Sequence, residues 1–229
     1  VCSSDLGFTP SSATSGAVTL AGTLATTNGG TGLTSFTANQ VFYASSTSAV
    51  AQSTNLQFSG TDLTVYGITV GRGAGAVSTN TAVGASALNN NTTGSTTVAI
   101  GFNTMTSANT GADNVAVGAY VLSANTSGAE NIAIGRSTLG SNTTGSQNVA
   151  IGRATMNANT TGGANTAVGH NALAANTTAN YNSAIGYQAL YSNTSGGAND
   201  AFGTWTLYSN TTGGANSAVG YKALYSNST

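Results

Sequence analysis

Apolar residues recur at a fixed interval through residues 80–229. Each recurrence reads Ala, then Val, Ile or Phe, then Gly, and a Leu or Met follows four positions after the Gly. Successive glycines stand 17 residues apart, which gives eight complete units and a ninth that is cut short. A constant period predicts a repeat architecture in which each unit buries its apolar residues by stacking on its neighbours. The structural glycines of the repeat are Gly84, Gly101, Gly118, Gly135, Gly152, Gly169, Gly186, Gly203 and Gly220.

The length and composition of the unit predict its secondary structure. A pair of helices needs a longer repeat, and the Gly and Asn-Thr-Thr clusters of this unit would interrupt helices. One coil of backbone fits the length, and we expect each coil to contain two strands of about five residues joined by two turns. The predicted fold is all-β: a parallel β-solenoid (β-roll) of nine 17-residue coils, preceded by an irregular segment of β-strands and linker.

The columns, meaning the residues at one position in successive units, predict which side chains face inward. We expect the Val/Ile/Phe column and the Leu/Met column to form the interior because they hold the largest apolar side chains. Neighbouring residues of a strand point to opposite faces, so the Ala column, Ala82 through Ala218, would then point outward. An outward column without Lys or Glu suggests a face covered by other copies of the chain. We therefore expect a homotrimer or another parallel oligomer.

Two Asn columns are expected to form ladders that hydrogen-bond along the stack. The first Asn opens the unit in eight of nine copies, and Thr97 is the exception. The second stands seven residues after the Gly, beginning at Asn91, and this column fails only at Ala108.

The chain before the repeats divides by composition. Residues 1–6 resemble the translated end of a sequencing adapter, and we exclude them from the fold. Residues 7–35 are rich in Ser, Thr and Gly and are typical of a linker or fibre shaft. Residues 36–79 contain short strand-like runs. We expect residues 80–229 to form the solenoid domain, and we interpret the incomplete ninth unit as a truncation at its C-terminal end.

Charge excludes several partners. Only 4% of residues are charged and the net charge is −1, whereas about a quarter of a typical globular domain is charged. Four basic residues, Arg72, Arg136, Arg153 and Lys222, cannot build the basic surface that nucleic acid requires. No apolar run approaches the roughly 20 residues of a membrane span, so we expect no membrane insertion.

The sequence contains few residues in an arrangement that would support catalysis. Asp113 and Glu130 share a column, and stacking would place them about 5 Å apart, as in some glycosidases. The neighbouring positions supply no further catalytic group, so we interpret both as solvated turn residues. His170 is the single His of the chain and has no Cys or carboxylate partner in the pattern. We therefore expect neither an enzyme nor a metal or cofactor site.

Aromatic residues gather in the last three units. Tyrosines recur in one column there, and further rings stand close by. Exposed rings could bind the apolar faces of sugars, while packing within the ladder or an oligomer interface would also explain them. The candidate glycan contacts are Tyr187, Tyr191, Trp205, Tyr208, Tyr221 and Tyr225.

The repeat resembles two families of surface proteins. Units such as Asn-Ser-Ala-Ile-Gly at 182–186 resemble the head repeats of trimeric autotransporter adhesins, although the adhesin unit is shorter than 17 residues. The longer run at 182–194, and the segments 28–34 and 42–46, resemble bacteriophage tail-fibre proteins. These resemblances imply a trimeric fibre that binds a host cell-surface glycan or protein.

The resulting functional prediction is a structural and adhesive fibre segment for host-surface recognition, carried on a virion as part of a tail fibre. One alternative is the head domain of a trimeric autotransporter adhesin on the bacterial outer surface. An alternative of another class is an ice-binding β-solenoid, because the Thr-Thr pairs repeat on an almost uncharged surface.

Overall fold

The computed structural model describes residues 9–14, 17–21, 40–46, 49–58 and 62–228. The chain divides into two units, Val1–Tyr66 and Gly67–Thr229. The second unit therefore begins before residue 80, where the sequence pattern placed the start of the solenoid. Each unit is considered by itself.

The first unit contains antiparallel strands. Strand β1 (Thr9–Thr14) pairs with β2 (Ala17–Ala21), inside the segment expected to be a linker or shaft. Strand β3 (Gln40–Ser46) pairs with β4 (Ala49–Phe58), and β4 pairs with β5 (Leu63–Val65). Strands β3, β4 and β5 overlap the strand-like runs of the sequence at residues 40–43, 56–58 and 63–66, although β3 and β4 are longer than those runs.

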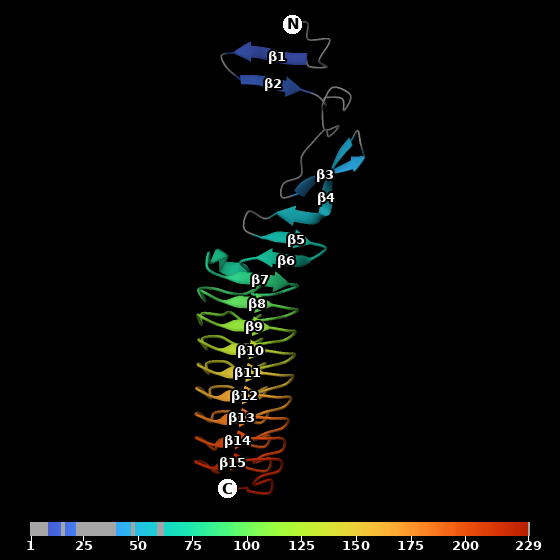
Figure 1. The fold of residues 1–229 in the computed structure, drawn as a ribbon. Helices are drawn as coiled ribbons and strands as arrows, with labels where there is room; N and C mark the ends of the chain where they lie inside the picture. Colours follow the sequence, from blue (N-terminus) through green and yellow to red (C-terminus); the bar gives the residue numbers. More distant parts are fainter. Residues whose placement is uncertain (1–8, 15–16, 22–39, 47–48, 59–61, 229) are drawn as a thin grey trace. The chain divides into compact units, whose positions relative to one another are not determined.

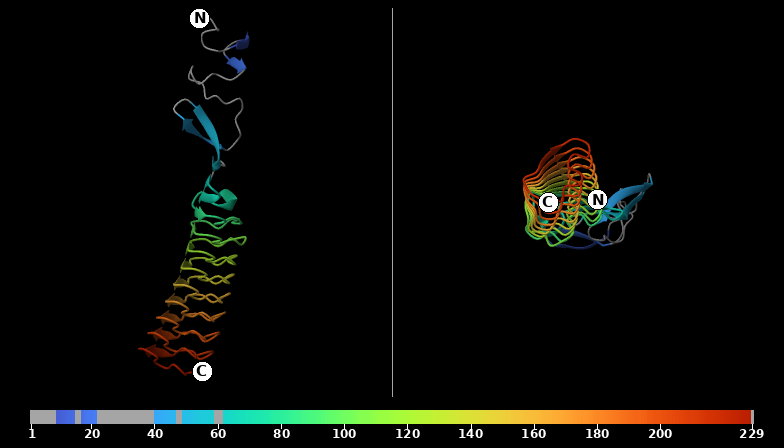
Figure 2. Two further views of the ribbon diagram at one scale, coloured as in Figure 1. Left: turned by 90° about the vertical axis from the view of Figure 1, so that its right-hand side faces the viewer. Right: turned by 90° about the horizontal axis from the view of Figure 1, so that it is seen from below.

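The second unit is a β-solenoid, as the period predicted (Figure 1). Strand β6 (Ile68–Gly71) pairs antiparallel with the first repeat strand, and a short 3-10 turn at Ala74–Ala76 lies between them in sequence. Each repeat strand then pairs in parallel with the next, so that every residue faces its own counterpart 17 positions later, as Ala133 faces Ala150. The repeat strands are β7 (Thr81–Gly84), β8 (Val98–Ile100), β9 (Val115–Val117), β10 (Ile132–Ile134), β11 (Val149–Ile151), β12 (Thr166–Val168), β13 (Ser183–Ile185), β14 (Asp200–Phe202) and β15 (Ser217–Val219). Viewed along the stack, successive coils overlie one another with a gradual rotation (Figure 2).

Each coil contains one short strand, so the expectation of two strands of about five residues was wrong. The remainder of the coil is a series of turns and bends. Residues with positive φ are the reason: in one coil these are Ser137 (57°), Leu139 (50°) and Gln147 (62°). A left-handed residue bends the backbone away from the extended conformation. Backbone bonds still join the coils there, since the Leu139 N–H donates to the Thr155 carbonyl at 3.1 Å.

The expected orientation of the strand was also wrong, because the Ala column faces inward and the Val/Ile/Phe column faces outward. In β10, Ala133 is 0% exposed, whereas Ile132 and Ile134 are 39% and 38% exposed. The Leu/Met column does point inward as expected, and it fills the core together with the alanines. The coil is narrow, and a close-packed interior already filled by Leu leaves room for a methyl group rather than a branched side chain.

Both Asn columns form buried ladders, as predicted. The Asn148 amide donates to Asn131 Oδ1 at 3.0 Å in the first ladder, and Asn142 donates to Asn125 Oδ1 at 2.8 Å in the second. The ladders repeat these bonds from coil to coil and satisfy polar groups that would otherwise be costly to bury.

The break expected in the second ladder at Ala108 is absent. Asn109 takes the place instead, one residue later in the sequence. It donates to Asn91 Oδ1 at 3.1 Å and accepts from Asn125 at 2.9 Å. A small change in the local turn therefore preserves the ladder, because a buried amide without a partner would cost more than the adjustment.

Glycine is required where the strand ends, because the coils approach closely there. Gly152 has a φ of 131°, and a Cβ atom on it would lie 2.6 Å from the carbonyl oxygen of Gly169 in the next coil. Both the backbone conformation and the contact explain why all nine units keep Gly at this position.

Candidate functional site

The three tyrosines of one column form a stacked ladder on the last three coils. The ring centroids of Tyr191 and Tyr208 are 5.1 Å apart and those of Tyr208 and Tyr225 are 5.0 Å apart. The ring planes in both pairs are within 6° of parallel. The stacking follows directly from the repeat, because one position recurs at the spacing between coils. We call Tyr191, Tyr208 and Tyr225 the tyrosine ladder.

Trp205 is at the centre of a second group of rings. Its centroid is 5.8 Å from Tyr187, edge to face, and 5.6 Å from Tyr221 in a tilted arrangement. The indole Nε1 donates a hydrogen bond of 2.8 Å to Oε1 of Gln188, which precedes it in the same column. These contacts fix the orientation of the indole ring.

Lys222 joins the two groups. Its Nζ lies 5.1 Å from the ring of Trp205, 5.4 Å from that of Tyr221 and 5.6 Å from that of Tyr225. Cation–π contacts of this length are stabilising. All six aromatic residues singled out in the sequence therefore lie on one surface, which we call the aromatic patch. The roles of Lys222 and Gln188 were missed, although both share the column of Trp205.

His170 extends this surface by one coil. Its ring stacks on Tyr187 with centroids 5.5 Å apart and planes 12° from parallel. Nη1 of Arg153 lies 3.2 Å from Nε2 of His170. Because arginine can only donate, this contact requires Nε2 to accept and the imidazole proton to be on Nδ1. The sequence showed that His170 shares the column of Tyr187 but did not predict this stacking.

The ladder changes the acidity of its middle member. Desolvation raises the pKa of the Tyr208 hydroxyl above its ordinary value of 10.0, and the neighbouring Tyr191 and Tyr225 raise the pKa further. A negative charge is unfavourable at this desolvated position between two other tyrosines, so the neutral form of the Tyr208 hydroxyl is favoured. The neutral Tyr208 hydroxyl can donate and accept hydrogen bonds.

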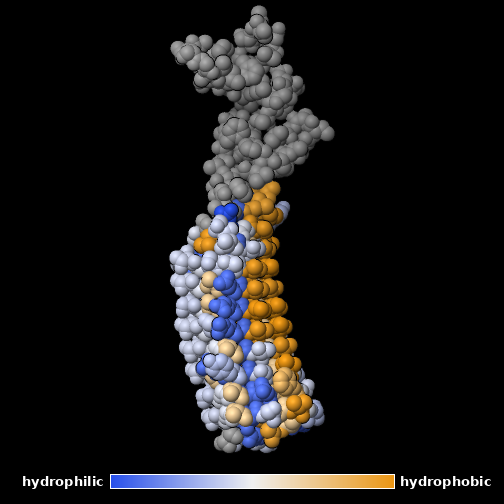
Figure 3. All heavy atoms as spheres, turned by 60° about the vertical axis from the view of Figure 1, so that its left-hand side comes forward, coloured by the Kyte–Doolittle hydropathy of each residue, from blue (hydrophilic) through white to orange (hydrophobic). Residues whose placement is uncertain are grey.

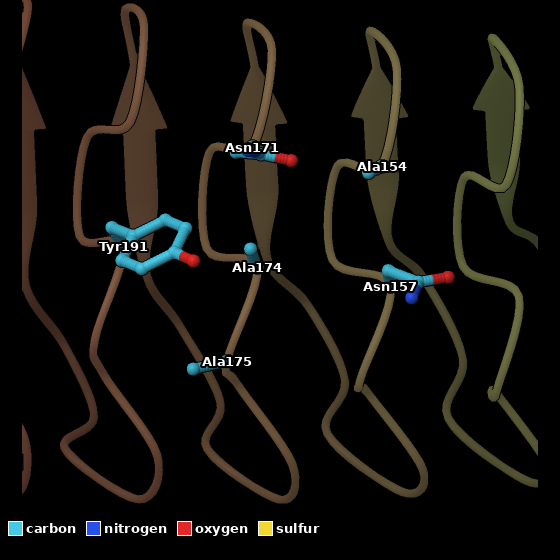
Figure 4. Close-up of a pocket in the computed structure, with 6 residues that line it drawn as sticks. All are labelled: Ala154, Asn157, Asn171, Ala174, Ala175 and Tyr191. Atoms are coloured by element: carbon cyan, nitrogen blue, oxygen red, sulfur yellow. The ribbon is translucent and has the colours of Figure 1, made fainter.

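A groove of about 290 Å³ opens at the N-terminal end of the tyrosine ladder (Figure 4). It crosses three coils and combines an aromatic ring, two amides and three methyl groups. A second hollow of about 310 Å³, on another side of the coils, includes Gln147, Asn180 and Tyr181 in its wall. The first groove, here the Tyr191 groove, is lined by Ala154, Asn157, Asn171, Ala174, Ala175 and Tyr191.

The outward faces of the repeat strands carry a band of apolar side chains along the stack (Figure 3). The band is two columns wide on β8–β11 and one column wide on β12–β15, where Thr, Ser and Asp take the outer position. We call it the apolar stripe. Its residues are Val83, Ile100, Val117, Ile134, Ile151, Val168, Ile185, Phe202 and Val219, with Val98, Val115, Ile132 and Val149 beside them.

The two threonines of each Thr-Thr pair have different environments. Oγ1 of the first bonds along the stack, as Thr143 donates to the carbonyl of Thr160 and Thr160 to that of Thr177, both at 3.0 Å. The second, such as Thr144 or Thr161, is exposed. The second threonines recur from coil to coil, so the ice-binding alternative stays a prediction.

The acidic pair is not supplemented by other reactive groups. Asp113 and Glu130 are both exposed, and Nε2 of Gln147 donates to Oε2 of Glu130 at 3.2 Å. Among the described residues, no three His, Cys, Asp or Glu side chains are grouped as a metal ion would require. No helix in that part of the chain is long and apolar enough to cross a membrane.

Comparisons with protein-family models, with curated proteins and with solved structures found no match. The features of this chain that bear on function are therefore the solenoid and its two unusual surfaces, the apolar stripe and the aromatic patch.

Proposed function

We propose that this chain is a segment of a structural and adhesive fibre that recognises a host surface, as a tail fibre of a phage virion does. The observation that carries the proposal is the apolar stripe, which follows the solenoid from β7 to β15. A fibre needs such a surface to associate with parallel copies of itself.

The stripe supports lateral assembly through its size and regularity. Soluble monomers rarely expose continuous apolar areas beyond a few hundred Å². Here Ile and Val repeat once or twice per coil on a surface with few charges. Parallel copies have the same spacing between coils, so each coil of one copy can pack against the same coil of the next. A homotrimer would place Ile134 and Ile151 of each copy near a common axis.

This basis for assembly differs from the one that the sequence suggested. The Ala column was expected to contact the other copies, but these alanines are inside the coil. The columns that flank them have larger side chains and can bury more apolar area per residue. The corrected orientation therefore strengthens the argument for assembly.

The aromatic patch supports the adhesive role. Tyr and Trp are the residues most enriched at recognition surfaces, because each offers a rigid apolar face and a polar group. In this chain they are concentrated on the last coils. We propose that this surface contacts a glycan or a protein of the host cell.

Residues 28–34, 42–46 and 182–194 resemble bacteriophage tail-fibre proteins. For this reason we propose a tail fibre before an adhesin head on the bacterial outer surface. Both alternatives share the same assembly and the same exposed aromatic patch. The proposal as a whole therefore predicts a parallel trimer, whichever of the two carries it.

Sedimentation velocity of the purified chain tests the proposal. We expect a trimer, and we expect the double variant Ile134→Lys/Ile151→Lys to sediment as a monomer because two unpaired charges would be buried. The matched control is Thr144→Lys/Thr161→Lys, which adds the same charges to exposed positions of the same two coils. A monomeric wild-type chain contradicts the proposal, as does a trimer that the stripe variant leaves intact.

A further inference from the structure

The Tyr191 groove exists because the tyrosine ladder stops. The column of the ladder reads Asn157, Ala174 and then Tyr191 in three successive coils. Tyr208 stacks on one face of Tyr191, whereas the position on the other side holds only the methyl group of Ala174. Figure 4 shows the Tyr191 hydroxyl directed toward the coil that carries Ala174. Within the described residues, Tyr208 is the one ring stacked on Tyr191, so its other face is available to a ligand.

The other rings of the aromatic patch are more fully occupied. Trp205 is in contact with Tyr187, Tyr221 and Lys222. Tyr208 has a ring on each side. A ligand that needs a free ring face therefore finds it at Tyr191, where the groove provides the space.

Two amides complete the groove. Asn157 and Asn171 line it from adjacent coils, and no hydrogen bond of either side chain is present among the described residues. They differ in this from the Asn residues of the buried ladders, whose amides donate to the Asn of the preceding coil. Each free amide can donate and accept at once, as neighbouring hydroxyl groups of a sugar require.

We propose that the Tyr191 groove binds a neutral pyranose unit, a hexose or an N-acetylhexosamine, of a host glycan. The C–H face of the sugar packs on the free face of Tyr191, and its hydroxyls bond to Asn157 and Asn171. The lining contains no charged side chain, which favours a neutral ligand. Its volume of about 290 Å³ is suited to one or two sugar rings. This inference rests on the proposed adhesive function and adds the binding site and the ligand class.

The variant Ala174→Tyr gives the sharpest test, because it fills the groove while Tyr191 and the two amides stay in place. The new ring would extend the ladder at a position where three other coils already carry Tyr. The control is Asn89→Tyr, which adds the same ring in the same column, far from the groove along the stack. Tyr191→Ala removes the stacking face, and Asn171→Gly removes an amide at a residue whose φ of 57° suits glycine.

Saturation-transfer NMR with glucose, galactose, mannose and N-acetylglucosamine, each added alone, identifies the sugar, and titration gives its Kd. We expect binding by wild type and Asn89→Tyr, and at least about tenfold weaker binding by Ala174→Tyr and Tyr191→Ala, since one stacking contact is lost. Asn171→Gly should weaken binding severalfold.

Equal affinity of Ala174→Tyr and wild type would overturn the inference, and so would the absence of binding by all four sugars. The fibre proposal is judged separately by sedimentation, which needs no ligand. A trimer that binds none of these sugars would leave the fibre proposal in place and remove the groove as a sugar site.

Discussion

Asn131 and Asn142 donate their side-chain amides to the same acceptor, the carbonyl oxygen of Gly145, at 3.0 and 2.9 Å. The two residues belong to different ladders, so this shared acceptor ties both ladders together within one coil. The next coil repeats the arrangement with Asn148, Asn159 and Gly162. The interior of the solenoid is therefore a continuous network of satisfied amides beside the Leu column.

The network predicts a large effect of Asn142→Ala. The change removes the bonds of Asn142 to Asn125 and Gly145, and it leaves one of the two N–H groups of the Asn159 amide without its acceptor. We expect a loss of about 3 kcal/mol in the free energy of unfolding, because buried polar groups lose their partners. Urea denaturation measures it. The control Ser141→Ala, at an exposed neighbouring position, should change stability by less than about 0.5 kcal/mol. Equal effects of the two variants would contradict the role of the network.

Gly152→Ala should be poorly tolerated. The φ of 131° is unfavourable for alanine, and the added Cβ would lie 2.6 Å from the Gly169 oxygen and 2.8 Å from Oγ1 of Thr155. We expect the free energy of unfolding to fall by more than about 3 kcal/mol. Gly197→Ala is the matched control, since its column contains Ala at two other positions, Ala112 and Ala129. Circular dichroism during heating compares the variants, and a normal melting temperature for Gly152→Ala would refute the close-contact explanation.

Glycine should stabilise the chain at Ala164. This residue has a φ of 53°, a left-handed conformation that costs an L-residue about 1–2 kcal/mol. Ala164→Gly removes that cost, so the melting temperature should rise although no contact is gained. Ala158→Gly, in the same coil and not among the residues with positive φ, should lower it through the greater freedom of the unfolded chain. A decrease for both variants would mean that the left-handed conformation carries little strain.

The tyrosine ladder predicts a loss of stability at high pH. The pKa of Tyr208 is raised in the folded chain, mainly by desolvation, so the folded state holds this proton more tightly than the unfolded state. The corresponding stabilisation is complete below about pH 10 and is lost as pH rises through the higher pKa of the folded state. Tyr208→Phe removes this contribution, so the melting temperature should fall less steeply above pH 10 than in the wild type. Tyr181→Phe, outside the ladder, serves as control and should retain the wild-type slope.

The sequence by itself determined the period and the fold. Identical positions every 17 residues can bury apolar side chains and pair backbone only by stacking, so the Leu column, the Asn ladders and the tyrosine ladder followed from the spacing. The same reasoning placed all six aromatic candidates on the last three coils. Position along the stack is fixed by residue number alone.

The tertiary structure determined which side chains face inward and where the backbone turns within each coil. Hydrophobicity ranked Ile134 above Ala133 for the interior, but the narrow coil filled by Leu139 accepts only the smaller side chain. Left-handed residues replaced the expected second strand, and Asn109 restored a ladder that the sequence appeared to break. Lys222 contacts Trp205, its counterpart in the preceding coil, and reaches Tyr225 as well because the turn of its own coil brings those two columns together. These outcomes depend on volume and turn geometry within one coil, which a repeat period does not specify.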